Sequence, residues 1–153
     1  MKIMEMLKAK FIIDELKAAG KRDVLAELIS VITEAENSFD PEAMLRILLE
    51  REQLGSTGIG DGIAIPHGKL SGLDGTVLVF GRSRKGVAFD ALDGKPVHLF
   101  FLLVAPENSA GKHLKVLARI SRMLKDGAFR KNLLEAKVRD DLVRIIAQKD
   151  DEC

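Results

Sequence analysis

The chain has a single cysteine, no tryptophan and no tyrosine, and it lacks any long apolar segment. Because Cys153 is alone, no disulfide can form within the chain, which favours a reducing compartment. The longest apolar run, residues 99–105, is far too short to cross a bilayer. The first residues also lack the small-residue cleavage site of a signal peptide. We therefore expect a cytoplasmic protein without membrane insertion.

An excess of charge of either sign is also missing, because 24 Lys and Arg residues are balanced by 23 Asp and Glu residues. A net charge of +1 gives no electrostatic reason to bind nucleic acid or an anionic membrane surface. Hydrophobic residues make up 46% and charged residues 31% of the chain, which is typical of a globular protein. No linker or repeat divides the sequence, so we expect residues 1–153 to form one domain with a complete core.

Apolar spacing predicts both helices and strands. Helices are expected at residues 18–36, 41–54, 109–124, 128–135 and 140–149. Strands are expected at residues 11–16, 63–65, 76–83 and 96–105, the last two joined by a hairpin-like return. The strand at 96–105 is apolar on both faces, which is typical of a central strand covered on both sides. The pattern predicts an α/β fold of three layers, a central mixed β-sheet flanked by helices, and leaves the strand order open.

His67 lies between Pro66 and Gly68, just after the glycine-rich residues 55–62, which we expect to be irregular. Proline fixes the approach of the chain and glycine permits a sharp turn after the histidine. A glycine-rich loop can leave backbone N–H groups free to point at an anion. The pattern is therefore suited to an imidazole that holds a phosphoryl group, and the alternative is a surface histidine in a turn.

The other two histidines occupy regular elements. His113 falls in the apolar stripe of helix 109–124, one turn before Leu117. It is either a core histidine satisfied by a backbone carbonyl or a second histidine brought to the sheet edge beside His67. His98 lies within strand 96–105, and a structural role is expected for it.

Arg51 comes at the end of helix 41–54, just before the glycine-rich loop. Helical periodicity places Arg51 on the flank of the apolar stripe and Glu52 nearer its centre, so periodicity does not single out Arg51. A guanidinium is nevertheless the preferred bidentate partner of phosphate, and Arg51 is close to the loop in sequence. The alternative is a solvated arginine.

Several cofactor motifs are absent. The loop lacks the P-loop lysine, its glycines miss the Rossmann spacing, and no His or Cys spacing suggests zinc. We predict no metal or other cofactor, and ATP is a poor candidate for the phosphoryl donor. A phosphorylated protein is a better one, because a phosphoramidate already has high transfer potential and the acceptor has only to position it and screen its charge.

Residues 51–70, REQLGSTGIGDGIAIPHGKL, resemble the active-site signature of the enzyme IIA domains of the mannitol–fructose class in the bacterial phosphoenolpyruvate:sugar phosphotransferase system. Residues 102–124 resemble the second conserved block of the same family. The resemblance spans nearly the whole chain. It implies a mixed sheet flanked by helices and a phosphocarrier function.

The resemblance also implies a role for each candidate residue. His67 matches the phosphoacceptor, phosphorylated on Nε2 by the phosphohistidine of the small carrier HPr or a paralogue. His113 matches the histidine that supports the phosphoryl group by a hydrogen bond, and Arg51 matches the arginine that helps to neutralise it. The hydroxyls of Ser56 and Thr57 are further candidates for contacts with the phosphate.

Residues 85–109 look most similar to the stand-alone, nitrogen-related enzyme IIA, which regulates protein partners according to its phosphorylation state. Sugar-transport versions are often fused to a IIB or IIC domain, and neither is recognised here. We therefore expect a regulatory phosphocarrier. One alternative is a transport enzyme IIA that passes phosphate to the cysteine of a separate IIB for fructose or mannitol uptake. Another is a module that binds a phosphorylated ligand without covalent chemistry, which the Pro-His-Gly placement disfavours.

Overall fold

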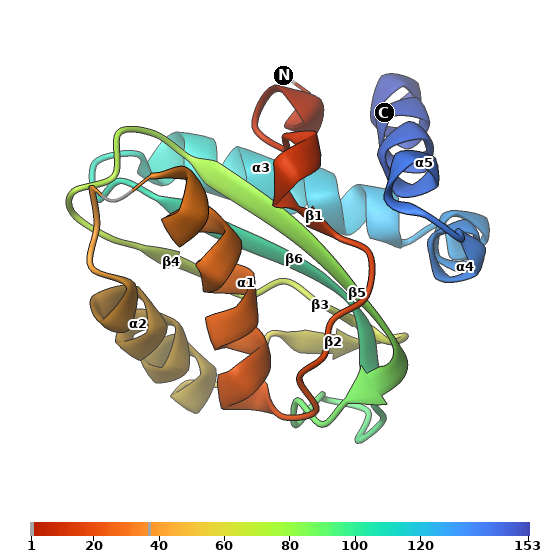
Figure 1. Cartoon of the computed structure of the whole chain (residues 1–153), viewed down its shortest axis with the longest axis horizontal. Coiled ribbons are helices and arrows are strands. Elements are labelled where there is room, and N and C mark those ends of the chain that lie inside the picture. Colours follow the sequence, from red (N-terminus) through yellow and green to blue (C-terminus); the bar gives the residue numbers. More distant parts are fainter. Residues whose placement is uncertain (1, 37) are drawn as a thin grey trace.

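The computed structural model describes residues 2–36 and 38–153, in which a mixed β-sheet lies between two groups of helices (Figure 1). The helices are α1 (Lys21–Ala35), α2 (Pro41–Gln53), α3 (Ala110–Leu124), α4 (Gly127–Glu135) and α5 (Arg139–Glu152), with 3₁₀ turns η1 (Ile3–Glu5) and η2 (Ala9–Phe11). The strands are β1 (Ile12–Ile13), β2 (Gly58–Gly60), β3 (Ile63–Ala64), β4 (His67–Lys69), β5 (Val77–Val87) and β6 (Val97–Ala105). The predicted α/β fold with a flanked mixed sheet is confirmed.

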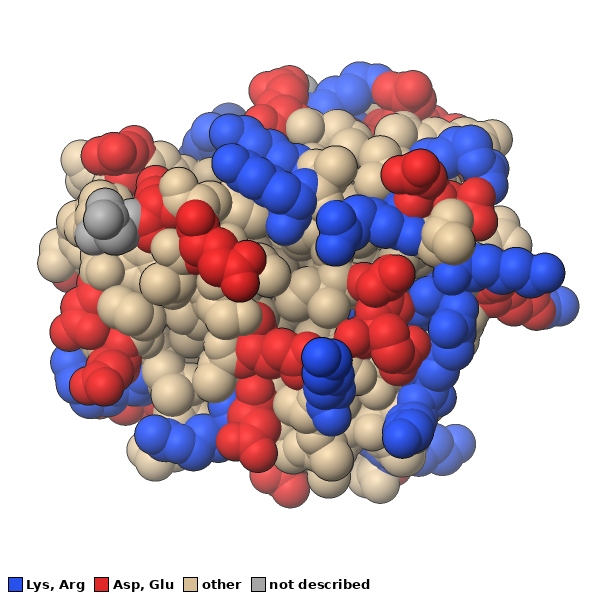
Figure 2. All heavy atoms as spheres, in the orientation of Figure 1, with Lys and Arg blue, Asp and Glu red and all other residues tan. Residues whose placement is uncertain are grey.

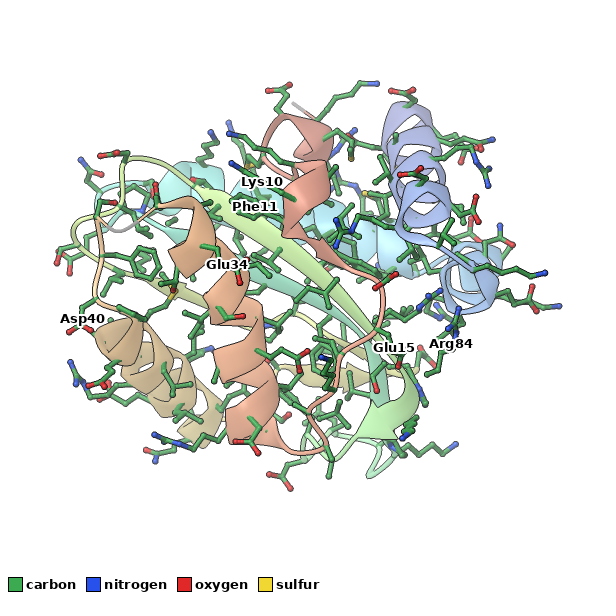
Figure 3. The ribbon with its side chains drawn as sticks, in the orientation of Figure 1. Lys10, Phe11, Glu15, Glu34, Asp40 and Arg84 are labelled. Carbon is green, nitrogen blue, oxygen red and sulfur yellow. The ribbon has the colours of Figure 1, made fainter. Side chains whose placement is uncertain are left out.

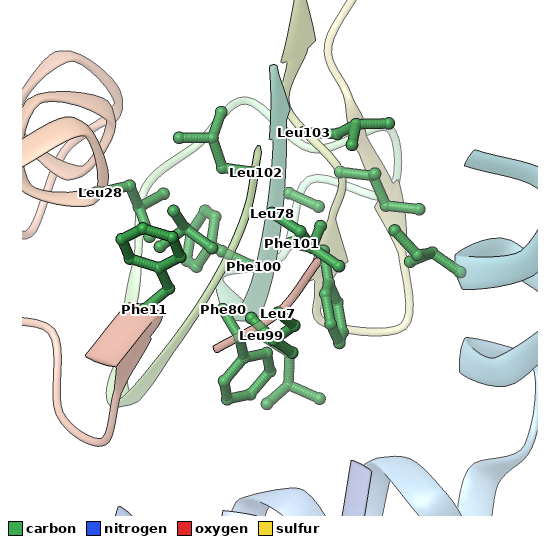
Figure 4. Close-up of a cluster of buried hydrophobic side chains, with 14 of the residues drawn as sticks. Leu7, Phe11, Leu28, Leu78, Phe80, Leu99, Phe100, Phe101, Leu102 and Leu103 are labelled. Carbon is green, nitrogen blue, oxygen red and sulfur yellow. The ribbon is translucent and has the colours of Figure 1, made fainter. Parts of the chain in front are cut away.

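Strand β6 is central, as its apolar sequence predicts. It pairs antiparallel with β5 along one edge and parallel with β3 and β4 along the other. The sheet is completed by β1, parallel to β5, and by β2, antiparallel to β3. Every residue of β6 is buried except the half-buried His98. Successive side chains of β6 point to opposite faces of the sheet: Phe100 and Leu102 point toward α1, whereas Phe101 and Leu103 point toward α3 (Figure 4).

The expectations for two strands and for one loop need correction. The segment 11–16 contributes only the two residues of β1, because the preceding residues turn in η2. The loop 55–62 is not wholly irregular, since it contains β2. A Cβ at Gly58 would lie 3.0 Å from both Cα and Cβ of Ala91, so this glycine permits a close approach of two chain segments. Strand β5 runs on to Val87, beyond the expected 76–83, with an irregularity in its pairing after Arg82.

Helix α2 is fixed at both ends, and this decides where Arg51 and the following loop lie. At its start, the side chain of Asp40 accepts a hydrogen bond from the backbone N–H of Glu42 at 3.0 Å, and Pro41 occupies the first turn. After its end, Gly55 has a φ of 148°, which favours glycine over other residues.

The surface is mixed in charge. Figure 2 shows Lys and Arg side chains interspersed with Asp and Glu over the face that carries α1 and α2. Some of these charges tie segments together: Glu15 accepts a hydrogen bond from the backbone N–H of Arg84 at 2.9 Å and lies 3.7 Å from its guanidinium (Figure 3). Across residues 2–36 and 38–153, none of the helices combines the length and the apolar composition that a membrane span requires.

Candidate functional site

His67 is the first residue of β4, whose pairing with β6 places it opposite Leu103. The predicted sharp turn at Gly68 is wrong, because Gly68 continues the strand. A Cβ at Gly68 would lie 3.0 Å from Ile47 and 3.4 Å from Leu48, so glycine here lets α2 pack closely on β4. Since alternate residues of a strand face opposite sides, His67 and Lys69 face away from α2.

The ring of His67 is oriented by its own backbone neighbour. Its Nδ1 lies 2.8 Å from the carbonyl oxygen of Ile65. A carbonyl oxygen can only accept a hydrogen bond, so Nδ1 carries the proton and donates it. In the neutral ring, Nε2 is then the nitrogen with the free lone pair, and it is the atom available for nucleophilic attack.

The ring is also held in its neutral form. Burial lowers the pKa of His67 below 6.5, although the hydrogen bond to Ile65 opposes this shift. The positive charge of Arg51 lowers the pKa of His67 further, and the negative charge of Glu52 raises it. The net lowering leaves the imidazole unprotonated, and therefore nucleophilic, at neutral pH.

His113 lies beside His67. The two ring centroids are 5.6 Å apart and the ring planes are tilted by 55°. His113 is only 5% exposed, and its buried Nδ1 has no hydrogen-bond partner among residues 2–36 and 38–153. The interpretation as a core histidine satisfied through Nδ1 by a carbonyl is therefore not supported. Burial and the nearby His67 and Lys69 lower the pKa of His113, so this ring is neutral as well.

Arg51 occupies the last turn of α2, and its Nη1 donates a hydrogen bond to the carbonyl oxygen of Gly55 at 2.9 Å. Because its charge lowers the pKa of His67, the guanidinium lies within electrostatic range of the imidazole. The structure thus brings together His67, His113 and Arg51, three residues separated in sequence and carried by β4, α3 and α2.

Lys69 is a second cation at this site that the sequence patterns did not single out. It follows His67 by two residues on β4 and shares its face of the strand. Its positive charge also reaches the ring of His113, whose pKa it lowers. The alternation of a strand would have identified Lys69, but only if a strand had been expected to begin at His67.

The hydroxyls of Ser56 and Thr57 both have protein partners. Ser56 Oγ donates to the carbonyl oxygen of Phe89 at 3.1 Å and accepts from the backbone N–H of Gly58 at 3.0 Å. Thr57 is buried, and its hydroxyl donates to the carboxylate of Glu52. A contact from either hydroxyl to a phosphoryl group stays a prediction.

The backbone N–H groups of the loop are less free than its glycine content suggests. Those of Gly55 and Thr57 donate to Glu52, at 3.1 Å to its carbonyl oxygen and 3.1 Å to its carboxylate respectively. The expectation of several free N–H donors is therefore wrong for these residues and for Gly58. The positive charges beside the histidines belong to the side chains of Arg51 and Lys69.

His98 lies apart from this group. Its Nδ1 donates to the carbonyl oxygen of Ser83 on β5 at 2.8 Å, which fits the structural role expected for it. In the part of the chain that the structure describes, no three His, Cys, Asp or Glu side chains are grouped as metal ligands.

Comparisons with known proteins identify the family of this chain. The sequence model of the family "Phosphoenolpyruvate-dependent sugar phosphotransferase system, EIIA 2" matches residues 5–149. The chain is 37% identical over 147 residues to a nitrogen regulatory protein of Bradyrhizobium diazoefficiens, which covers 96% of this chain and 95% of that protein. It is 40% identical over 150 residues to the fructose-specific EIIABC component of Bacillus subtilis, of which it spans 24%.

Solved structures show the same fold. The crystal structure of the nitrogen regulatory protein IIA-Ntr from Neisseria meningitidis superposes with a TM-score of 0.86 and 34% sequence identity. The superposition covers 94% of this chain and 98% of that protein. The similarity therefore extends over nearly all of both chains.

Proposed function

This chain belongs to the EIIA 2 family of the phosphoenolpyruvate-dependent sugar phosphotransferase system, and we propose that it carries the phosphoryl group on Nε2 of His67. Proteins of this family are phosphocarriers that pass a phosphoryl group from one protein to another. The observation that carries the proposal is the hydrogen bond from Nδ1 of His67 to Ile65, which leaves Nε2 as the nucleophile beside His113.

The transfer step follows from this arrangement. The lone pair of Nε2 attacks the phosphorus of the donor's phosphohistidine, a new P–N bond forms, and the electron pair of the old P–N bond returns to the donor's ring nitrogen. Positive charge develops on the ring of His67 as it attacks, and the hydrogen bond from Nδ1 to Ile65 stabilises that charge. Such a transfer depends mainly on positioning and charge screening, which need no metal or nucleotide from the acceptor.

The surrounding residues have distinct parts in this proposal. Arg51 and Lys69 offset the negative charge of the phosphoryl oxygens, Arg51 as a planar fork and Lys69 as a point charge. The ring of His113 lies beside that of His67, where it can contribute a hydrogen bond to a phosphoryl oxygen. Ser56 is a further candidate for a phosphate contact, for which its hydroxyl would exchange its bond to Phe89 for one to a phosphoryl oxygen.

We infer a regulatory role in the cytoplasm, with HPr or its nitrogen-related paralogue as donor and regulatory proteins as targets. The nitrogen regulatory relative supports this inference, because the match covers nearly all of both proteins. The alternative is a sugar-transport enzyme IIA that donates to a separate IIB cysteine for fructose or mannitol uptake, and the fructose-specific relative supports that reading. We further propose that residues 1–153 form one enzyme IIA domain that binds no nucleic acid and uses no cofactor.

Phosphorylation of purified protein tests the assignment. The chain is incubated with phosphoenolpyruvate, enzyme I and HPr, and the incorporated phosphate is measured by mass spectrometry before and after mild acid treatment. We expect one acid-labile phosphate on the wild type and on the matched control His98→Ala, and none on His67→Ala. Labelling that persists in His67→Ala would refute the assignment. Addition of a IIB domain then separates the two roles, since rapid transfer to its cysteine indicates transport.

A further inference from the structure

A buried carboxylate lies beneath the glycine-rich loop. Glu52 follows Arg51 in the last turn of α2, yet its side chain is only 3% exposed. Its Oε1 accepts from the backbone N–H of Thr57 at 3.1 Å and lies 3.1 Å from Nζ of Lys21, and its Oε2 accepts from the Thr57 hydroxyl. We call these three residues the Lys21–Glu52–Thr57 network. A buried carboxylate that is fully paired in this way restrains the segments that supply its partners.

The network joins segments that are far apart in sequence. Lys21 begins α1, and its Nζ lies 4.9 Å from the ring centroid of Phe89 and 3.6 Å from the carboxylate of Asp90. The carbonyl oxygen of Phe89 in turn accepts from Ser56. The loop is thereby held between the start of α1, the end of α2 and the connection from β5 to β6.

Two routes lead from the network to the reacting groups. The carbonyl oxygen of Thr57 accepts from the N–H of Ile65 at 3.1 Å, and the carbonyl oxygen of Ile65 accepts from Nδ1 of His67. The second route starts at the main chain of Glu52: its carbonyl oxygen accepts from the N–H of Gly55, and the carbonyl oxygen of Gly55 accepts from the guanidinium of Arg51. Because only the first route passes through Thr57, displacement of Thr57 would disturb the nucleophile.

We propose that Glu52 and Thr57 are positioning residues for phosphoryl transfer: the buried carboxylate fixes Thr57, and Thr57, through Ile65, sets the orientation of the His67 ring. This inference rests on the proposed function of His67. It gives the Thr57 hydroxyl a role behind the loop, where it holds the carboxylate, in place of a contact with the phosphate. Neither residue touches the reacting atoms in this proposal.

Paired substitutions separate positioning from mere stability. Thr57→Val keeps the shape of the side chain and removes the hydroxyl donor, Thr57→Ser keeps the hydroxyl, and Glu52→Gln removes the charge while keeping the size. Thr33→Val is the matched control, because the hydroxyl of Thr33 donates within its own helix, to the carbonyl oxygen of Ile29 at 3.3 Å. Each variant is first checked for native structure by circular dichroism.

The measurement is the single-turnover rate of phosphoryl transfer from phosphorylated HPr, as a function of HPr concentration. We expect Thr57→Val and Glu52→Gln to lower the maximal rate by about 10-fold or more with a little-changed half-saturating concentration, because misplacement of reacting groups slows the chemical step. Thr57→Ser should restore most of the rate, and Thr33→Val should leave it unchanged. Glu52→Gln should also lower the pKa of His67, measured by NMR, because the negative charge that raises this pKa is lost.

The outcomes distinguish this inference from the proposed function. If the wild type takes no phosphate on His67, the proposed function fails. If the wild type is labelled on His67 and both Thr57→Val and Glu52→Gln react at the wild-type rate, only the positioning role fails. If Thr57→Val does not fold, the rate and the His67 pKa of Glu52→Gln decide the question on their own.

Discussion

Replacement of His113 by leucine should make the protein more stable and a poorer phosphocarrier. His113 is buried in α3 with the rest of the helix's core face, but its Nδ1 has no hydrogen-bond partner in the described residues. Leucine fills a similar space, carries no polar atom and has a higher helix propensity than histidine. A residue kept for function at the expense of stability should show this opposite effect on the two properties.

The expected change in the free energy of unfolding follows from the unpaired Nδ1 of His113. A buried polar group without a partner costs about 1–3 kcal/mol, and imperfect packing of the leucine offsets part of the gain. We expect His113→Leu to raise the free energy of unfolding by about 1 kcal/mol, which corresponds to about 2–4 °C in Tm for a chain of this length.

His98→Leu is the matched control, because it is also a histidine in a regular element. Its Nδ1 donates to the carbonyl oxygen of Ser83 at 2.8 Å, so its removal leaves a buried acceptor unpaired and should lower the free energy of unfolding by about 1 kcal/mol or more. Urea unfolding followed by circular dichroism suits a chain without tryptophan or tyrosine. Equal destabilisation by the two substitutions would show that His113 is satisfied as fully as His98, and the reasoning would be wrong.

The remaining predictions concern charge. Because the pKa values of His67 and His113 are lowered from 6.5, the unfolded chain binds more protons than the folded one just below pH 6.5. The contribution of these two rings to the free energy of unfolding should therefore be fully present above pH 6.5 and be lost as the pH falls through the lowered pKa values. Urea unfolding at a series of pH values measures this loss, and the double variant His67→Ala/His113→Ala should not show it. Arg51→Ala should slow phosphoryl transfer by about 100-fold, since it removes charge stabilisation, whereas Arg46→Ala, on the exposed side of the same helix, should not. Asp150→Ala should lower the free energy of unfolding by about 3–5 kcal/mol, because the buried guanidinium of Arg119 loses its carboxylate partner, 2.8 Å away; a loss below about 1 kcal/mol would exclude that role for Asp150.

The layer architecture could be predicted because local sequence patterns determine it. The apolar run of β6 on both faces indicated a central strand, and the spacing of apolar residues located all five helices. The start of α2 is likewise local, because its cap is a hydrogen bond between Asp40 and Glu42, two residues apart. These features depend on neighbours within a few residues, so the sequence alone is informative about them.

Of the short strands, β2 and β4 could not be predicted, because β2 is Gly-Ile-Gly without apolar alternation and the partner of β4 is distant in sequence. Strands β2 and β4 have three residues each, and β4 exists through its pairing with β6. Without β4, Gly68 was interpreted as a turn residue and Lys69 was overlooked. Local patterns cannot show that Gly68 is needed for the packing of α2.

The residues of the candidate site could be predicted from the sequence only in part, for a similar reason. The resemblance identified His67, His113 and Arg51, and the structure brings these residues together. Periodicity placed Glu52 nearer the centre of the apolar stripe than Arg51, and Glu52 is indeed buried. A carboxylate on a buried helix face was a signal of a paired charge, but its partners Lys21 and Thr57 become apparent only in the folded chain.

NMR of the phosphorylated, ¹⁵N-labelled chain tests the central claim most directly, because coupling between phosphorus and a ring nitrogen identifies the bonded atom. The hydrogen bond that commits Nδ1 to Ile65 predicts a single phosphorus resonance coupled to Nε2 of His67. Coupling to Nδ1 of that ring, or to a nitrogen of either other histidine, would contradict the account.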